Sequence, residues 1–238
     1  GGNAGQPVLW RATLDNFEIT PPDWERADSG IAGIDTGTVI YSLAAYYYTG
    51  HTPPQPVLAG TGTGCWQGSA GGFNWTASVF RGSPLFGKLN AIDVMPKWFG
   101  SHAWAAGRSG VTPAAFSSND QGLNWKYHGL PALIEGEATA VAIAPGTSDT
   151  VYVALYSNLM RSMDGGDTWV QCYHIRNNRF TALACDPENP SHVYAGGGPD
   201  FVLMRSTDFG DSWSSISPVD GTPAGITCMT VAIMDSLP

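Results

Sequence analysis

The sequence predicts an all-β protein, a β-propeller built from four-stranded blades. The first observation is an octet of the form Ser-x-Asp-x-Gly-x-x-Trp that occurs three times. Its tryptophans, Trp125, Trp169 and Trp213, follow one another at steps of 44 residues. The second observation is that a repeat of this length holds about four short strands with their turns, the size of one propeller blade. The third is the frequency of glycine and proline, at 30 and 17 residues, which suits a chain with many tight turns.

Each octet has the composition of a tight turn between two strands. An Asp two residues before a Gly folds its carboxylate back onto backbone N–H groups, and the Ser hydroxyl adds a second local hydrogen bond. The Gly supplies the positive φ of a tight hairpin, and the Trp opens the next strand with a large apolar face. The octet residues are Ser118, Asp120, Gly122 and Trp125, then Ser162, Asp164, Gly166 and Trp169, then Ser206, Asp208, Gly210 and Trp213.

The sequence before the octets is typical of short strands. Residues 184–196 read as a strand, a turn of Asp, Pro and Asn residues, and a second strand rich in β-branched and aromatic side chains. Residues 144–155 precede the second octet in the same way. Arg11, Arg161 and Arg205 share one position of the repeat, just before the octet, so we expect these three arginines to be structural.

The octets and the segments before them resemble the Asp-box, or BNR, repeats of sialidase-like β-propellers. They are also similar to the repeats of xyloglucanases, sortilin-type receptors and a photosystem II assembly factor. The resemblance implies that each box lies in the hairpin between the third and fourth strands of a blade, on the face opposite the usual ligand site. It therefore implies a structural role for Asp120, Asp164 and Asp208.

The two ends of the chain are expected to share one blade. Residues 6–13 match the strands that precede the octets, residues 14–17 are a decayed octet, and a further strand begins near Trp24. Residues 226–233 read as a first strand. Together the two ends would make one split blade, a closure that protects the edges of the sheets.

Between those ends the sequence predicts four complete blades. The first runs from about residue 29 to residue 75, with strands at 31–35, 38–44 and 55–58, and its octet survives only as Gly72 and Trp75. The next begins near Lys88 and ends at Trp125, and two more end with the later octets. Five blades therefore account for residues 1–238 as a single propeller domain. The alternative is a fragment of a larger propeller of about six to eight blades.

Composition restricts the partners. A net charge of −9 disfavours nucleic acid and anionic membrane surfaces. No stretch approaches the roughly 18 apolar residues of a membrane span. The four cysteines, Cys65, Cys172, Cys185 and Cys228, form no Cys-x-x-Cys pair, so we expect no metal and no cofactor, while their even number is compatible with two disulfides.

The start of the chain bears on where the protein works. It begins Gly1-Gly2-Asn3 without Met, which suits a processed chain or a fragment as well as a cytoplasmic protein. We expect an extracytoplasmic protein, secreted or periplasmic.

The candidate binding residues lie in the connections that differ most from blade to blade. Residues 46–54 form the longest and most aromatic of these connections, which we take to join the second and third strands of a blade. Tyr46 is expected to pack in the core, while other connections contribute Glu135 and Glu137. The predicted binding face, opposite the octets, carries Tyr47, Tyr48, His51, Arg108, His174 and Arg176.

Two functions from different classes suit this sequence. The first is a non-catalytic propeller that serves as a binding or assembly scaffold for a protein partner or a glycan. The second is a glycoside hydrolase of sialidase-like or xyloglucanase-like type, which would need two carboxylates about 5–10 Å apart across the channel. Sialidase motifs outside the boxes are not recognisable. We therefore assign no catalytic residue and favour the scaffold.

Overall fold

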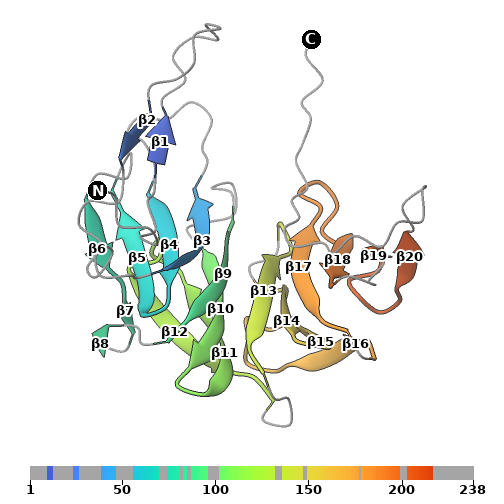
Figure 1. Ribbon diagram of the computed structural model, residues 1–238. Coiled ribbons are helices and arrows are strands. Elements are labelled where there is room, and N and C mark those ends of the chain that lie inside the picture. Colours follow the sequence, from blue (N-terminus) through green and yellow to red (C-terminus); the bar gives the residue numbers. More distant parts are fainter. Residues whose placement is uncertain are drawn as a thin grey trace, which may run out of the picture.

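The structure, a computed structural model, describes residues 10–12, 24–26, 39–46, 56–69, 74–80, 83–84, 87–95, 102–131, 136–146, 149–176, 178–198 and 203–216. The regular elements in these ranges are all β-strands. Three four-stranded sheets and one six-stranded sheet form the blades of a β-propeller, and the first strands of neighbouring blades contact one another (Figure 1). The predicted all-β propeller fold is therefore confirmed.

The four main strands of each blade form an antiparallel meander in chain order. Blade 1 contains β3 (Ile40–Ala45), β4 (Val57–Thr61), β5 (Gly64–Gly68) and β6 (Trp75–Ala77). Blade 2 contains β9 (Leu89–Val94), β10 (Ala103–Ser109), β11 (Thr112–Ser118) and β12 (Asn124–Gly129), with β7 (Val79–Phe80) and β8 (Ser83–Pro84) added at its outer edge, where the additional strand β7 pairs parallel with β12. Blade 3 contains β13 (Ala138–Ile143), β14 (Val151–Leu155), β15 (Asn158–Ser162) and β16 (Val170–His174). Blade 4 contains β17 (Phe180–Cys185), β18 (Val193–Gly197), β19 (Leu203–Ser206) and β20 (Ser214–Ile216).

The described residues form four blades, and the prediction of five is wrong. The expected split blade is represented by β1 (Trp10–Ala12) and β2 (Trp24–Arg26), which pair only with each other in the described part of the chain. A blade needs a hydrogen-bonded sheet that reaches the central channel, and a pair of three-residue strands does not provide one. The expected inner strand, residues 226–233, lies outside the described residues, so closure by the two termini stays a prediction.

The strand numbering predicted for blade 1 is also wrong. Residues 38–44 were expected to form the second strand and residues 55–58 the third. Instead β3 is the first strand and β4 the second, because β3 pairs with β4 and β4 pairs with β5. The strand expected at residues 31–35 lies outside the described residues. Alternating side chains indicate that a segment is a strand, but only the pairing gives its place in the sheet.

All four first strands carry a β-bulge near their start. The register with the second strand shifts at Tyr41, Asn90, Thr139 and Thr181. A bulge re-aims a side chain, and here the side chains reach the next blade. Asn90 Nδ2 donates to the carbonyl of Ala138 at 2.8 Å, and Thr139 Oγ1 donates to the carbonyl of Phe180 at 2.8 Å. The bulges therefore connect neighbouring blades around the channel.

Most of the hydrophobic core lies between blades, and one small cluster lies within blade 1 around Ala59 and Trp75. One cluster joins blades 2 and 3 around Trp104 and Val153, and another joins blades 3 and 4 around Tyr152 and Phe180. A third joins blades 1 and 2 and includes Tyr46, which is only 4% exposed. The predicted packing role of Tyr46 is therefore confirmed.

Candidate functional site

The three octets fold into turns with the same hydrogen bonds. They connect β11 to β12, β15 to β16 and β19 to β20, which are the third and fourth strands of their blades. In the second turn Ser162 Oγ donates to Asp164 Oδ1 at 2.7 Å and accepts from the Gly166 N–H at 2.8 Å. Asp164 Oδ1 also accepts from the Thr168 N–H at 2.8 Å. Corresponding bonds form in the other two turns.

Hydrogen bonds hold the carboxylates of the turns in their ionised form. Bonds from Thr168 lower the pKa of Asp164 to about 2, and bonds from Ser212 lower the pKa of Asp208 to about 2. Desolvation raises the pKa of Asp120, but hydrogen bonds from its own turn outweigh it and leave that pKa lowered. These carboxylates therefore receive hydrogen bonds from within their own turns, as a structural residue should.

The glycine of each turn packs against the second strand of the preceding blade. A Cβ on Gly122 would lie 2.5 Å from Leu58 Cδ2, and one on Gly166 would lie 2.6 Å from Trp104 Cη2. A Cβ on Gly210 would lie 3.4 Å from Tyr152 Cε1. The turns therefore form part of the joints between blades.

A group of charged side chains gathers at the other end of the inner strands. Glu137 Oε2 accepts from Lys88 Nζ at 2.9 Å and from Asn90 Nδ2 at 3.0 Å, while its Oε1 lies 3.2 Å from Arg108 Nη1. Lys88 Nζ lies 4.5 Å from the centroid of the Tyr41 ring. These five residues form what we call the Glu137 cluster.

The electrostatics of the Glu137 cluster favour binding over proton transfer. The hydrogen bond from Lys88 is the largest cause that lowers the pKa of Glu137, and the charge of Arg108 acts in the same direction. A general acid needs a raised pKa, so Glu137 is poorly suited to that role. The Arg108 side chain is 43% exposed, so part of its guanidinium faces solvent and can meet a partner.

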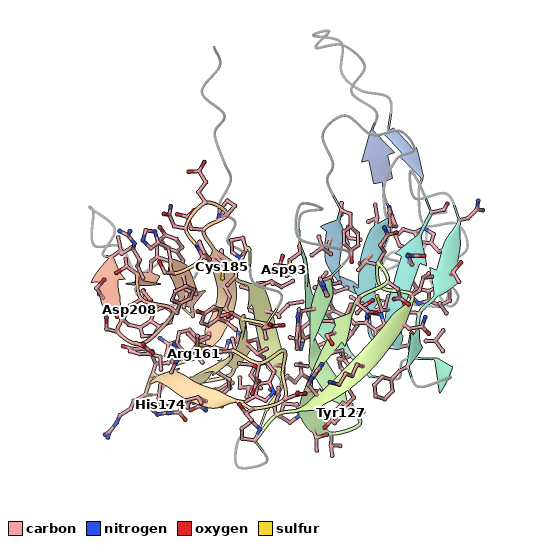
Figure 2. All side chains as sticks on the ribbon, turned by 180° about the vertical axis from the view of Figure 1, so that it is seen from behind. Asp93, Tyr127, Arg161, His174, Cys185 and Asp208 are labelled. Carbon is pink, nitrogen blue, oxygen red and sulfur yellow. The ribbon has the colours of Figure 1, made fainter. Side chains whose placement is uncertain are left out.

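Of the predicted binding residues that the structure describes, only Arg108 lies in this cluster. His174 ends the outermost strand of blade 3, where its Nδ1 lies 3.0 Å from Asn158 Oδ1, and Arg176 is exposed just beyond it. Both lie at the end of the blades where Arg108 lies, but at the end of an outer strand rather than an inner one. Figure 2 shows His174 at the periphery of the molecule.

The remaining predicted binding residues, Tyr47, Tyr48 and His51, lie outside the described residues, as does Glu135. Their connection joins the first strand of blade 1 to the second, with Ala45 paired to Val57. First-to-second connections leave the sheet at the end that carries the octet turns, so the reason for placing these three residues opposite the octets is wrong. Their binding role stays a prediction.

Sequence reasoning missed Lys88, Asn90 and Tyr41. One signal was available, because Lys88, Glu137 and Arg179 each stand just before a first strand and are all charged. Asp93 was missed as well. Its Oδ2 accepts from the Ile143 N–H at 2.8 Å and its Oδ1 from the Val94 N–H at 2.9 Å. Desolvation nevertheless raises the pKa of Asp93 to about 6.

The cysteines and possible metal ligands add no chemistry in the described part of the chain. Cys65, Cys172 and Cys185 are free thiols, and Cys228 lies outside the described residues. Burial raises the pKa of Cys65 to about 12 and that of Cys172 to about 11, which makes both thiols unreactive. Among the described residues no group of three His, Cys, Asp or Glu side chains could hold a metal ion. Nor does any described helix have the length and apolar character to cross a bilayer.

Solved structures similar to this chain are β-propellers. The GH74 enzyme of Niastella koreensis superposes with a TM-score of 0.59 at 17% identity, over 75% of this chain and 30% of the enzyme. The GH74 xyloglucanase of Xanthomonas campestris superposes with a TM-score of 0.60 at 17% identity, over 91% of this chain and 32% of the enzyme. YCF48 from Cyanidioschyzon merolae superposes with a TM-score of 0.55 at 13% identity, over 92% of this chain and 69% of that one.

At these identities the similarity establishes the β-propeller fold and nothing finer. The chain spans about a third of the length of the GH74 enzymes. Comparisons with known protein families and with curated proteins found no match.

Proposed function

We propose that this chain is a non-catalytic, extracytoplasmic β-propeller that serves as a binding or assembly scaffold, and that its three octet turns are Asp boxes. The observation that carries the proposal is the Glu137 cluster. An ionised carboxylate that is held by two cations and an amide, beside an aromatic ring, has the chemistry of a contact surface. The favoured ligand is a protein partner, with a glycan as the alternative.

The surroundings of the cluster support a protein partner. Tyr41 and Leu43 are 44% and 47% exposed on β3, and Tyr41 contacts Lys88. Tyr and Arg side chains dominate the energetics of protein interfaces, because they combine a large contact area with directed hydrogen bonds. A partner that lies over this end of the inner strands would cover both the apolar and the charged groups.

Site-specific photo-crosslinking tests the position of the interface. A benzophenone side chain replaces Tyr41, and in a control it replaces Thr207, which is exposed in the third octet turn. In an extract of the source cells we expect one protein adduct from position 41 and none from position 207, with the adduct lost in Arg108→Ala. Adducts from position 207 alone would place the interface at the wrong end of the blades.

The same assay tests two predicted contacts outside the cluster. His174→Ala and Arg176→Ala, at the end of the blades where Arg108 lies, should each weaken adduct formation while the unfolding midpoint stays at that of the parent. Binding of the purified protein to immobilised glycans, in the absence of any protein adduct, would favour the glycan alternative. Recovery of the protein from the cytoplasmic fraction of the source cells would contradict an extracytoplasmic location.

The second candidate function is a glycoside hydrolase of xyloglucanase-like or sialidase-like type. One observation favours it: the pKa of Asp93 is raised to about 6, the direction that a general acid requires. Release of reducing sugar from xyloglucan, or of sialic acid from a sialoside, would support the hydrolase if Asp93→Asn abolished it. Such activity would overturn the non-catalytic scaffold.

A further inference from the structure

The joint between blades 3 and 4 contains a guanidinium in a defined seat. Arg161 Nη1 donates to the carbonyl of Phe209 at 2.5 Å and lies 2.8 Å from Asp211 Oδ1. The hydroxyl of Tyr152 donates to the same carbonyl at 2.9 Å. The Arg161 side chain is only 14% exposed. The seat therefore consists of an aromatic side chain on the preceding blade, and a carbonyl and a carboxylate on the octet turn of the next blade.

The joint between blades 2 and 3 has the same plan without the arginine. Trp104 pairs with Ser117 across β10 and β11, as Tyr152 pairs with Arg161 across β14 and β15. Ser117 thus stands in the place of Arg161. In the octet turn of the next blade, Gly165 stands in the place of Phe209. Two large side chains are therefore replaced by a serine and a glycine.

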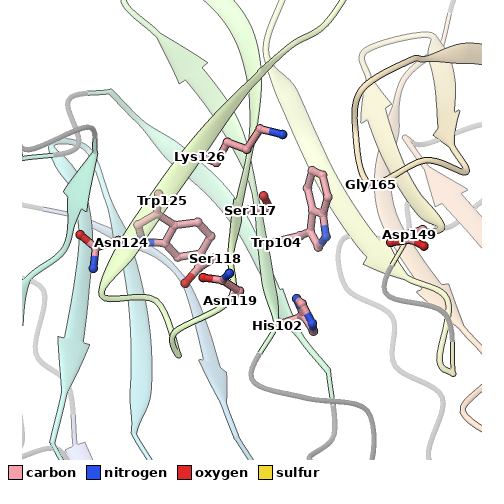
Figure 3. A pocket seen from close by; sticks show the side chains of 10 residues that line it. All are labelled: His102, Trp104, Ser117, Ser118, Asn119, Asn124, Trp125, Lys126, Asp149 and Gly165. Atoms are coloured by element: carbon pink, nitrogen blue, oxygen red, sulfur yellow. The ribbon is translucent and has the colours of Figure 1, made fainter.

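A pocket of about 480 Å³ lies at this joint, and both Ser117 and Gly165 line it (Figure 3). If Ser117 and Gly165 were an arginine and a phenylalanine, as at the joint between blades 3 and 4, their side chains would reduce this volume. Trp104 and Trp125 contribute aromatic surface to its wall, and Asp149 contributes a carboxylate. We call it the joint pocket.

One carboxylate beside the joint pocket corresponds to the carboxylate that holds Arg161, but the Lys126 side chain also lines the pocket. Asp167 occupies the position of Asp211 in the repeat, and it pairs with Lys126 at 3.3 Å. Both of these side chains are well exposed, at 70% and 63%, so their attraction is weak and Lys126 can move aside. An incoming cation would compete with Lys126 for Asp167. Ser117 Oγ lies 2.7 Å from His128 Nε2, and His128 Nδ1 lies 3.1 Å from the carbonyl oxygen of Gly166 in the octet turn. The His128 ring packs against one side of Trp104, with 4.7 Å between the ring centroids.

We propose that the joint pocket binds a guanidinium group from outside this chain, in the way that the next joint binds its own Arg161. Carboxylates and carbonyl oxygens accept the planar fork of N–H groups, and an indole face attracts the delocalised cation. The net charge of −9 favours the approach of such a ligand. The pocket lies beside the octet turns, away from the Glu137 cluster, so this inference is independent of the proposed function.

The first test measures binding of small guanidinium probes by calorimetry. N-acetyl-arginine amide should bind, and the isosteric citrulline amide, which is neutral, should bind at least about tenfold more weakly, a difference of about 1.4 kcal/mol. Asp167→Asn should weaken binding of the arginine probe several-fold. Lys126→Gln should strengthen binding of this probe several-fold, because it removes the competing ammonium. Equal binding of the arginine and citrulline probes, or no binding of either, would overturn the proposal.

The second test fills the joint pocket from within the chain. In Ser117→Arg the new guanidinium should take the seat, so the arginine probe should no longer bind and the unfolding temperature should rise. Ser117→Gln, a long side chain without charge, is the matched control and should give no such rise. Retained binding by a folded Ser117→Arg protein would overturn the proposal. If Ser117→Arg does not fold, the Asp167→Asn and Lys126→Gln results still decide it, because both side chains are exposed.

A third comparison distinguishes the two sources of the guanidinium. An acetylated Gly-Arg-Gly amide represents an arginine presented by a protein partner, and agmatine represents a free guanidino compound. Tighter binding of the peptide assigns the pocket to a protein partner, and tighter binding of agmatine assigns it to a small metabolite. The failure of both probes would overturn the guanidinium site while leaving the Glu137 cluster untouched.

Discussion

Two adjacent glycines in the second octet turn allow the packing between blades 2 and 3 to be separated from backbone strain. Gly165 and Gly166 both have positive φ, at 68° and 87°. A Cβ on Gly166 would lie 2.5 Å from His128 Nδ1 and 2.6 Å from Trp104 Cη2. A Cβ on Gly165 would come no closer than 3.7 Å to another side chain, at Asp149 Oδ1. The two alanine variants therefore share the strain and differ in the clash.

The expected magnitudes follow from this difference. Placing Ala at a left-handed position costs about 1–2 kcal/mol, and this applies to both variants. Overpacking adds about 1–3 kcal/mol at Gly166 alone, because Trp104 and His128 are buried and must shift. We expect Gly166→Ala to lower the free energy of unfolding by about 2–5 kcal/mol and Gly165→Ala by about 1–2 kcal/mol.

Urea denaturation of both variants beside the parent measures these losses, provided that the slopes agree. The result that would refute the reasoning is an equal loss in the two variants. In that case the glycine would serve the turn alone, and the octet turns would not be part of the joints between blades.

Three further predictions concern single side chains. Trp169 and Trp213 are partly buried against the clusters between blades, so Trp169→Ala and Trp213→Ala should each cost about 3 kcal/mol, the lower end of the range for large aromatics, and more than Asp164→Ala; Trp variants as stable as the parent in denaturation would contradict the structural role of the octets. Because the pKa of Asp164 is lowered to about 2, its contribution to stability is present above about pH 4 and is lost as the pH falls towards 2. Asp164→Asn should therefore reduce the loss of stability in acid, and an unchanged acid profile would contradict the hydrogen bonds of the turn. Because the pKa of Asp93 is raised, its ionisation opposes folding as the pH rises from about 4 to about 6. A carboxyl NMR titration should have its midpoint near 6, and a midpoint near 4 would show that Asp93 is solvated.

The success of the sequence-based predictions depended on how well each blade kept the repeat. Blades 2, 3 and 4 carry complete octets between their third and fourth strands, and their fourth strands were correctly expected beside Trp125, Trp169 and Trp213. Blade 1 lacks the Asp of the octet, and there the strand numbering was wrong. An octet fixes the order of strands because it marks the third-to-fourth turn. In blade 1, which lacks a complete octet, the alternation of side chains predicted strands but not their order in the sheet.

The sequence by itself determined the turns, because their hydrogen bonds run between residues no more than four apart, as from the Gly166 N–H to Ser162 Oγ. Only the tertiary structure decided the candidate sites. Lys88 and Glu137 are 49 residues apart and meet because a first strand begins beside the first strand of the next blade. The joint pocket forms between Ser117 and Gly165, which belong to different blades. Neither residue alone indicates a pocket in the sequence. Contacts within a turn follow from a local pattern, whereas contacts between blades depend on which side chains the stacking of the sheets brings together.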